Sequence, residues 1–319
     1  MTSLSPDALE ALRTGSFCHV AAPTERGPHL TPLVFALSDD RLWLTTSRGS
    51  VKARAWRRDA RVTGLVRGEG VSVAFGGRVR TYDLLDPETW GRALLRTPAL
   101  VAASLRFTRK NARFFAGYAV DAEHVPLAWT PPGRLFVEVE IERAALVDEF
   151  GVIERRGRWS PSVASIERFR ARPSGAPALA ALPGPIREAL SGIGQAVLAV
   201  HGAAGGVVLP ARFVEEGPAL LVAVPREGLE LAGCDRPTTR AALAIDRPSS
   251  WRARLMTGAT AIGEAELVVP ALLTSGTSSA LQRIGRTGAP AQESALVRLR
   301  PHRIVWWSGW TSGTVVCRG

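Results

Sequence analysis

The sequence predicts a mainly β protein with a few peripheral helices, an α+β arrangement of two small β-barrels in one chain. Its 319 residues exceed the usual size of one compact domain, so we expect two. In each half, short segments rich in β-branched and aromatic residues alternate with turn residues, which is typical of antiparallel strands. An internal repeat relates the halves, and a second copy would cover the apolar face that a small barrel leaves open. We therefore expect a pseudo-dimer within one chain.

The repeat consists of short matches that keep their order and a nearly constant spacing. The Pro-Leu-Val-Phe segment at 32–35 matches Pro-Ala-Arg-Phe at 210–213, a separation of 210 − 32 = 178 residues. Further matches follow in the same order: Leu42 with Leu220, Arg61 with Arg240, and Gly77 with Gly263. The spacing grows slowly along the chain, as loop insertions would cause. Two copies predict a duplicated domain rather than a solenoid.

Local signals give the order of elements in the first copy. Ser5, Pro6 and Asp7 predict the start of a helix that Gly15 ends, because they supply a cap, a fixed φ and a favourable charge. A start signal at Asp86 and helical spacing up to residue 121 predict two further helices. Strands are predicted over 17–23, 30–37, 41–47, 60–66, 77–84 and 134–148, and the second copy ends in a strand over 294–307.

Composition marks a boundary between the copies. Residues 159–184 are dominated by Pro, Ser, Gly and Ala and have poor periodicity, which is typical of a linker. We therefore predict an N-terminal barrel over 1–158 and a C-terminal barrel over 185–319.

The basic composition does not identify a partner. The formal net charge is +11, and every cationic residue except Lys52 and Lys110 is an arginine. These residues are scattered along the chain without zinc-finger spacing or an aromatic single-strand-binding pattern, so we expect no nucleic acid partner. Three widely spaced cysteines, Cys18, Cys234 and Cys317, form no metal or redox motif, and no metal site is predicted.

The sequence does not predict export or membrane insertion. Asp7 and Glu10 lie where a secretory signal would need a basic and then an apolar region. The weakly charged stretch 191–211 is interrupted by glycines, His201 and Pro210, which argues against a transmembrane helix. We expect a cytoplasmic protein that does not bind a membrane.

One turn of the first copy combines the groups that hold a phosphate. Thr46 and Ser50 offer hydroxyls, Gly49 allows close backbone approach, and Lys52 supplies a point charge. The same residue types also suit a solvated hairpin turn. The lysine favours the phosphate interpretation, because the chain uses arginine almost everywhere else. The strand at 32–34 would set an extended backbone and apolar side chains against a planar ring.

Residues 27–66 resemble the pyridoxamine 5′-phosphate oxidase-like superfamily, the flavin and deazaflavin split-barrel oxidoreductases. The resemblance rests on the strand at 27–32, the Thr-Thr-Ser-Arg-Gly-Ser-Val-Lys turn at 45–52 and the strand start at 57–62. It implies two split β-barrels in one chain, with FMN bound through the first and hydride chemistry supplied by the cofactor. The implied cofactor-binding residues are Leu30, Thr31, Pro32, Leu33, Val34, Thr45, Thr46, Ser50 and Lys52, with Trp307 from the second barrel.

The repeat predicts that one of the two barrels has lost the phosphate turn. The positions equivalent to Thr46, Ser50 and Lys52 are Val224, Gly228 and Glu230. Two hydroxyls and a cation are thus replaced by methyl groups, hydrogen and an anion that should repel phosphate. We expect one cofactor site per chain, built on the first barrel's turn and walled partly by the second barrel.

Departures from the family pattern argue against pyridoxamine-phosphate oxidation itself. The vitamin B6 oxidases carry arginines where this chain has Leu30 and Val51, and an arginine-histidine substrate motif that has no counterpart in residues 305–319. We expect nearby residues to replace these arginines in part: His29 for the first, and Arg48 or Arg54 for the second.

The second copy supplies candidates for the other wall of the site. Its tryptophans are candidates for stacking on a ring, with packing in the core or between barrels as the alternative: Trp251, Trp306, Trp307 and Trp310. Arg252 and Arg254 are candidates for contacting an anion, with exposure to solvent as the alternative.

The leading functional prediction is an FMN-dependent oxidoreductase that moves hydride equivalents between a small organic substrate and NAD(P)H or another donor. Alternatives are a deazaflavin coenzyme in the same turn, heme held by His29, His124 or His201, and a cofactor-binding module without turnover. No catalytic acid or base is predicted. The chain would act as a monomeric pseudo-dimer or as a homodimer.

Overall fold

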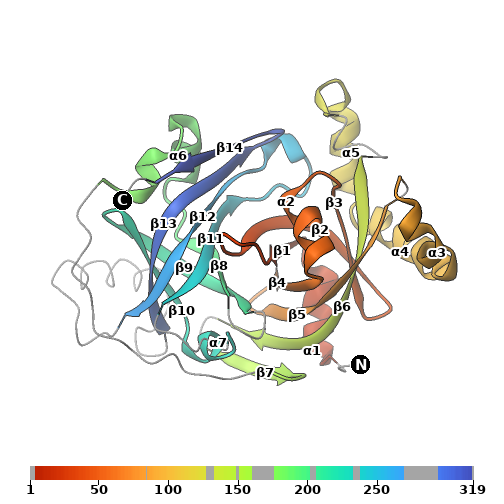
Figure 1. The fold of residues 1–319 in the computed structure, drawn as a ribbon, viewed down its shortest axis with the longest axis horizontal. Coiled ribbons are helices and arrows are strands. Elements are labelled where there is room, and N and C mark those ends of the chain that lie inside the picture. Colours follow the sequence, from red (N-terminus) through yellow and green to blue (C-terminus); the bar gives the residue numbers. More distant parts are fainter. Residues whose placement is uncertain are drawn as a thin grey trace.

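Two β-barrels lie side by side in the computed structural model of the chain (Figure 1). The structure describes residues 4–83, 85–126, 133–148, 151–159, 176–201, 206–232, 238–268 and 294–317. Both barrels are antiparallel and closed, with helices at the periphery, so the predicted fold class is confirmed.

The first barrel has the strand order β3-β2-β1-β4-β5-β6, which is closed by pairing of β3 with β6, and β7 extends it beyond β6. Its strands are β1 (Phe17–Ala22), β2 (His29–Ser38), β3 (Arg41–Ser47), β4 (Arg61–Arg67), β5 (Ser72–Tyr82), β6 (Arg134–Val147) and β7 (Val152–Arg156). Its helices are α1 (Pro6–Thr14), α2 (Val51–Arg58), α3 (Trp90–Leu95), α4 (Thr97–Lys110) and α5 (Ala112–Val120), with 3₁₀ turns η1 (Pro87–Thr89) and η2 (Ala122–His124).

The second barrel repeats this topology strand for strand, in the order β10-β9-β8-β11-β12-β13, closed by β10 with β13 and extended by β14. Its strands are β8 (Gln195–Val200), β9 (Val207–Glu216), β10 (Ala219–Pro225), β11 (Thr238–Arg247), β12 (Thr257–Val268), β13 (Ser294–Ser308) and β14 (Thr311–Val316). Helices α6 (Gly184–Leu190) and α7 (Arg226–Glu230) and 3₁₀ turns η4 (Ala178–Ala181) and η5 (Ala253–Leu255) accompany them.

A β-bulge recurs at the same place in both barrels. The register between β5 and β6 shifts at Gly77, and that between β12 and β13 shifts at Gly263. A Cβ at either glycine would collide with the carbonyl oxygen of Glu140 or Arg300, respectively. The bulge therefore requires glycine in both copies, and the sequence match between these glycines reflects a shared backbone.

Four elements go beyond the sequence prediction. Helix α2 was not anticipated after the phosphate turn, nor were the strands β7 and β14, and three helices rather than two follow residue 86. Of the predicted linker, residues 160–175 lie outside the described residues, as does Cys234. Ala178, Leu179 and Leu182 are buried against the second barrel, so this end of the segment packs as part of the core.

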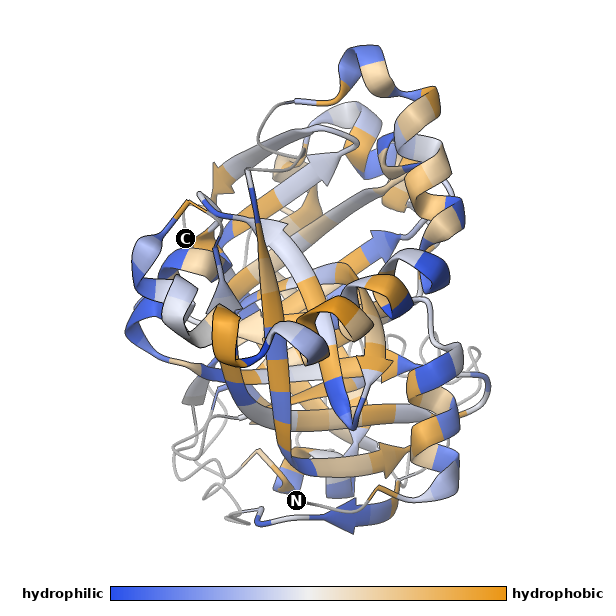
Figure 2. Ribbon diagram, turned by 90° about the vertical axis from the view of Figure 1, so that its right-hand side faces the viewer, coloured by the Kyte–Doolittle hydropathy of each residue, from blue (hydrophilic) through white to orange (hydrophobic). Residues whose placement is uncertain are grey.

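The two barrels share a hydrophobic core along their contact. It joins Ala21, Leu30 and Leu65 of the first barrel to the strands of the second. β2 packs against β11 and β12, while its repeat β9 packs against β4 and β5, so the contact is pseudo-symmetric. Figure 2 shows mostly hydrophobic strands at the centre of the molecule and mixed, partly hydrophilic helices at its edge.

Two polar contacts add specificity to this interface. The Thr260 hydroxyl donates to the carbonyl oxygen of Leu30 over 2.8 Å. His19 Nε2 lies 3.0 Å from Asp246 Oδ1, with both side chains buried. Within the described residues, we find no helix with both the length and the apolar composition needed to cross a bilayer.

Candidate functional site

A cleft between the barrels, which we call the first cleft, gathers most of the predicted site residues. It encloses about 360 Å³, within the usual size range of small-molecule sites. The first barrel contributes β2, the end of β3, the start of α2, the start of β6 and helix α5. The second barrel contributes η5, the end of β13 and the start of β14.

A cluster of hydroxyl groups forms one wall of the first cleft. The hydroxyls of Thr46 and Ser50 lie 3.1 Å apart, and Ser50 also accepts from the amide of Ala53 over 3.1 Å as the N-cap of α2. Ser50 therefore starts the helix and faces the cleft with the same side chain. The cluster also contains Thr45 and Ser47 at the end of β3.

Arg134 adds a cation that the sequence prediction missed. It is the first residue of β6, and pairing of β3 with β6 places it opposite Ser47. Its guanidinium donates to the Thr45 hydroxyl from Nε over 3.1 Å and from a terminal nitrogen over 2.6 Å. Burial lowers the pKa of Arg134 from its ordinary value, but a guanidinium stays charged at any physiological pH.

Lys52 is buried beside this cluster and reaches across to β2. Its ammonium donates to the hydroxyl of Thr31. Burial, and then the positive charge of Arg134, lower the pKa of Lys52 to about 8. A bound anion would favour the charged form and raise that pKa again.

His29 lies on the same strand and is held neutral. Burial, followed by the charges of Lys52 and Arg303, lowers its pKa to about 3. Its Nδ1 is buried and has no hydrogen-bond partner among the described residues. A neutral imidazole with an unused nitrogen can donate to or accept from a ligand in the cleft.

Aromatic side chains from both barrels also line the first cleft. Phe114 and Tyr118 of α5 lie with ring centroids 5.4 Å apart, and Tyr118 meets Trp310 edge to face at 5.2 Å. The ring of Trp307 lies over Gly258, where a Cβ would collide with it. Trp306 and Met256 also line the cleft. These side chains give the cleft apolar surfaces suited to a planar ring.

Every predicted site residue lines the first cleft except Leu30. The Leu30 side chain is fully buried in the core between the barrels, because Thr260 of β12 covers this part of β2. Trp306, Trp307 and Trp310 line the cleft, whereas Trp251 is exposed outside it.

Of the residues expected to replace the family's arginines, one lines the cleft and the others do not. His29 lines the cleft, but Arg48 is bound to Asp83 at 2.9 Å, and neither it nor Arg54 lines the cleft. Among the described residues, the arginine that lines the cleft is Arg134. Arg252 pairs with Asp121 at the end of α5, and Arg254 is also outside the lining. Of the three candidate heme ligands, His124 and His201 lie outside the cleft.

The cluster of hydroxyls and cations is not repeated in the second barrel. Strand pairing places Val224, Pro225 and Ser294 where the first barrel has Thr46, Ser47 and Arg134. Helix α7 begins directly after β10, so the intervening turn that carries Ser50 has no equivalent. Glu230 is exposed on α7 and is not among the residues lining a cleft.

Comparison with known proteins places the first barrel in a family. A sequence model of the pyridoxamine 5′-phosphate oxidase family matches residues 5–124. No curated protein matches the chain. The first barrel belongs to the pyridoxamine 5′-phosphate oxidase-like split barrels, and the second repeats its strand order, so the chain is a tandem pair of these barrels.

Several solved structures are similar to part of the chain. A FAD-binding protein from Mesorhizobium loti is 20% identical over 50% of this chain and 98% of its own, with a TM-score of 0.32. An FMN-binding protein from Nostoc punctiforme, related to pyridoxamine 5′-phosphate oxidase, is 18% identical over 48% and 90%, with a TM-score of 0.35. A heme-binding protein from Mycobacterium smegmatis is 18% identical over 42% and 59%, with a TM-score of 0.33.

Proposed function

We propose that the chain binds one FMN in the first cleft and acts with it as an oxidoreductase on a small organic substrate. The main support for this proposal is the charge of the side chains that line the first cleft. Lys52 is buried and Arg134 half-buried beside four hydroxyl side chains, and none of the described residues that line the cleft is acidic. The positive charges of Lys52 and Arg134 repel each other, and a phosphate dianion bound beside both would offset that repulsion.

The rest of the cleft fits the remainder of an FMN molecule. The apolar side chains of Leu33 and Val34 and the ring of Trp307 offer faces for a planar ring. Lys52 lies between the hydroxyl cluster and β2, where its ammonium can meet either the phosphate or a polar ring edge. His29 offers an uncharged hydrogen-bonding group at the same strand. When bound, FMN supplies hydride transfer, and these residues hold it and exclude water.

The substrate would be held by the aromatic side chains of the cleft. Tyr118, Trp306 and Trp310 line it, and they come from both barrels. Burial raises the pKa of Tyr118, so its hydroxyl stays protonated and can donate to a substrate oxygen. This supports a flat, partly apolar substrate, with NAD(P)H as a candidate donor.

His29 favours heme as a second candidate ligand. Iron binds a neutral imidazole nitrogen, and His29 is held neutral in the cleft with its Nδ1 unused among the described residues. A deazaflavin coenzyme would place the same kind of phosphate on the same cluster. The identity of the bound chromophore distinguishes heme and a deazaflavin from FMN.

The test is the absorption spectrum of the purified protein, with the released chromophore identified by mass spectrometry and counted per chain. We expect one FMN per chain, bound about 10- to 100-fold more weakly in Lys52→Met and Arg134→Gln, because each removes a charge-assisted hydrogen bond. Arg54→Gln is the matched control, since Arg54 is an exposed cation on α2 outside the cleft. A Soret band would identify the ligand as heme and a deazaflavin spectrum would identify it as a deazaflavin coenzyme, and either result would exclude FMN. A protein that neither carries nor takes up FMN, a deazaflavin or heme would refute the proposal.

A further inference from the structure

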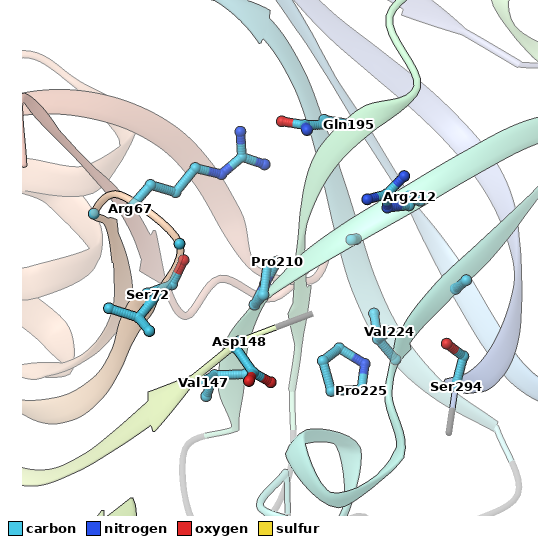
Figure 3. Close-up of a pocket in the computed structure, with 15 residues that line it drawn as sticks. Arg67, Ser72, Val147, Asp148, Gln195, Pro210, Arg212, Val224, Pro225 and Ser294 are labelled. Carbon is cyan, nitrogen blue, oxygen red and sulfur yellow. The ribbon is translucent and has the colours of Figure 1, made fainter. Parts of the chain in front are cut away.

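Helices α3 and α4 form a surface that neither cleft between the barrels includes. They lie at the right-hand edge of the molecule in Figure 1, and α4 packs against β2 of the first barrel. The first cleft is lined by α5 but by no described residue of α3 or α4. The same holds for a second cleft, shown in Figure 3, which strand ends and turns of both barrels line. A ligand in either cleft would therefore leave this surface uncovered.

The inward face of α4 explains how the helix is attached. Ala103 and Phe107 are buried one turn apart, and the Phe107 ring meets that of Phe136 edge to face at 5.7 Å. At the end of the helix, the Asn111 amide donates to the carbonyl oxygen of Phe35 over 3.2 Å. A surface helix packed in this way ordinarily carries polar residues on its outward face.

The outward face of these helices is apolar instead. Pro98, Val101 and Leu105 follow one another at helical spacing on the exposed side of α4, and Leu94 and Leu95 precede them at the end of α3. We call these five residues the apolar stripe. Its larger side chains are 74% exposed at Leu94, 87% at Leu95, 54% at Val101 and 68% at Leu105. Neighbouring exposed side chains of this kind mark a surface that a partner or a membrane covers.

The charge around the apolar stripe indicates what covers it. Residues 89–120 contain no aspartate or glutamate and six basic residues, which are Arg92, Arg96, Arg106, Arg109, Lys110 and Arg113. This segment therefore carries +6 of the chain's net charge of +11. Arg106 is in an exposed pair with Asp39 at 3.5 Å, whereas Arg109 and Arg113 are exposed and form no ion pair with the described residues.

A second copy of the chain and a nucleic acid both suit this surface poorly. A two-fold dimer places the same patch against itself, so the arginines beside one stripe would face those beside the other, and like charges oppose binding. A nucleic acid backbone would match the positive charge but would give the exposed leucines no apolar surface. An anionic lipid surface offers both phosphates and an apolar interior.

We infer that α3 and α4 hold the protein on the surface of a membrane that contains anionic lipids. The apolar stripe enters the boundary between headgroups and acyl chains, while Arg109 and Arg113 contact lipid phosphates. The helices lie in the plane of the interface, so this contact needs no spanning segment. Membrane binding was not expected from the sequence, because contacts with the barrel, and no local signal, decide which face of α4 is exposed.

The test mixes the whole protein with lipid vesicles and measures the bound fraction by flotation. Vesicles made from equal amounts of phosphatidylcholine and phosphatidylglycerol are compared with vesicles of phosphatidylcholine alone. We expect saturable binding to the anionic vesicles and binding about tenfold or more weaker to the neutral ones, because each arginine near an anionic surface adds to the affinity. Raised salt should weaken the binding to anionic vesicles.

One pair of variants tests the apolar part of the contact. Leu94→Ser/Leu105→Ser should weaken binding about tenfold or more, because two apolar side chains no longer enter the membrane. The matched control is Ile153→Ser/Val316→Ser, two exposed apolar residues on β7 and β14, which should leave binding unchanged. Circular dichroism of each variant is compared with that of the parent.

A second pair tests the charged part and keeps the experiment decisive if the leucine variant does not fold. Arg109→Gln/Arg113→Gln should weaken binding to anionic vesicles about tenfold or more. Arg187→Gln/Arg226→Gln removes the same charge from exposed positions on α6 and α7 and should leave binding unchanged. Lys52→Met should weaken FMN binding and spare vesicle binding, so this contact and the proposed function are tested separately.

Membrane docking would be excluded by an absence of binding to both kinds of vesicle, by equal binding to both, or by control variants that lose as much binding as the test variants. Sedimentation without lipid supplies a further check, and we expect a monomer. A dimer that Leu94→Ser/Leu105→Ser dissociates would assign the apolar stripe to a second copy of the chain instead.

Discussion

The two barrels have the same topology but carry opposite charges at one buried position. Glu138 of β6 lies opposite Arg80 of β5, and the equivalent Arg298 of β13 lies opposite Glu266 of β12. Both side chains are fully buried. The fold therefore tolerates either sign there, provided that the surrounding partners are inverted as well.

The arginines that pair with Glu138 are more exposed to water than the Glu216 carboxylate that pairs with Arg298. Glu138 accepts from Tyr82 and pairs with Arg41 at 2.9 Å and with Arg96, and these arginines keep 19% and 36% of their side-chain surface exposed. Arg298 donates to Glu216 over 2.8 Å, and the Glu216 side chain is 1% exposed. A duplicated fold preserves backbone pairing more strictly than it preserves the chemistry inside it.

The largest expected effect comes from breaking the second of these charge clusters. Arg298→Met removes the buried guanidinium that donates to the buried carboxylate of Glu216, so we expect a loss of about 3–5 kcal/mol in the free energy of unfolding. Glu138→Gln should cost about 1–3 kcal/mol, because the arginines left behind can be solvated. Urea denaturation followed by circular dichroism measures both. Equal losses would contradict the difference drawn between the two clusters, and Arg298→Met/Glu216→Gln should recover part of the first loss.

A smaller loss of stability is expected at the β-bulge that recurs in the two barrels, and it should be equal in both. Gly77→Ala and Gly263→Ala each push a methyl group into a backbone carbonyl, so each should cost about 1–3 kcal/mol. Gly91→Ala in α3 is the control, since a Cβ there meets nothing within 4 Å and alanine favours a helix. Thermal unfolding of the three variants gives the comparison. A loss at one bulge glycine without a loss at the other would show that the repeat is not equivalent there.

The smallest expected effect is the pH dependence of binding in the first cleft, whose lysine has no counterpart in the second barrel. Lys52 has a pKa of about 8 in the free protein, and a bound phosphate raises it, so binding takes up a proton above pH 8. The affinity of the first cleft should be full below pH 8 and fall as the pH rises through 8, by at most about tenfold per unit. Fluorescence titration of FMN from pH 6 to 10 tests this, and Lys52→Met should remove the fall.

The sequence predicts the barrels well because turn chemistry and alternation are local. Asp39 and Asp40 end a strand with φ values of 53° and 58°, a conformation that aspartate tolerates better than most residues. Helix α2 was missed because its N-cap, Ser50, is also part of the phosphate turn, and the turn was interpreted by its chemistry alone. The short strands β7 and β14 lie at the edges of their sheets, where little apolar patterning is required.

The site was predictable where it is continuous in sequence. Residues 31–34 lie on β2 and residues 45–52 run from the end of the adjacent β3 into α2, and all the predicted residues within them line the first cleft. Arg134 was missed because pairing of β3 with β6 alone brings it to Thr45, far away along the chain. Leu30 lies outside the cleft lining because it packs against Thr260 of the other barrel, and no local signal in the sequence reports that contact.

The first cleft is assembled from two barrels that one polypeptide joins. Helix α5 of the first barrel approaches the second so closely that a Cβ at Gly117 would collide with the carbonyl oxygen of Trp251. In a pair of separate subunits, such a site would come apart on dilution, since its assembly depends on protein concentration. Here the tether keeps the halves at a fixed effective concentration. Each barrel was thus free to change separately. A substitution in one barrel of this chain alters a wall of one site, whereas in a pair of identical subunits it would alter a wall in both sites.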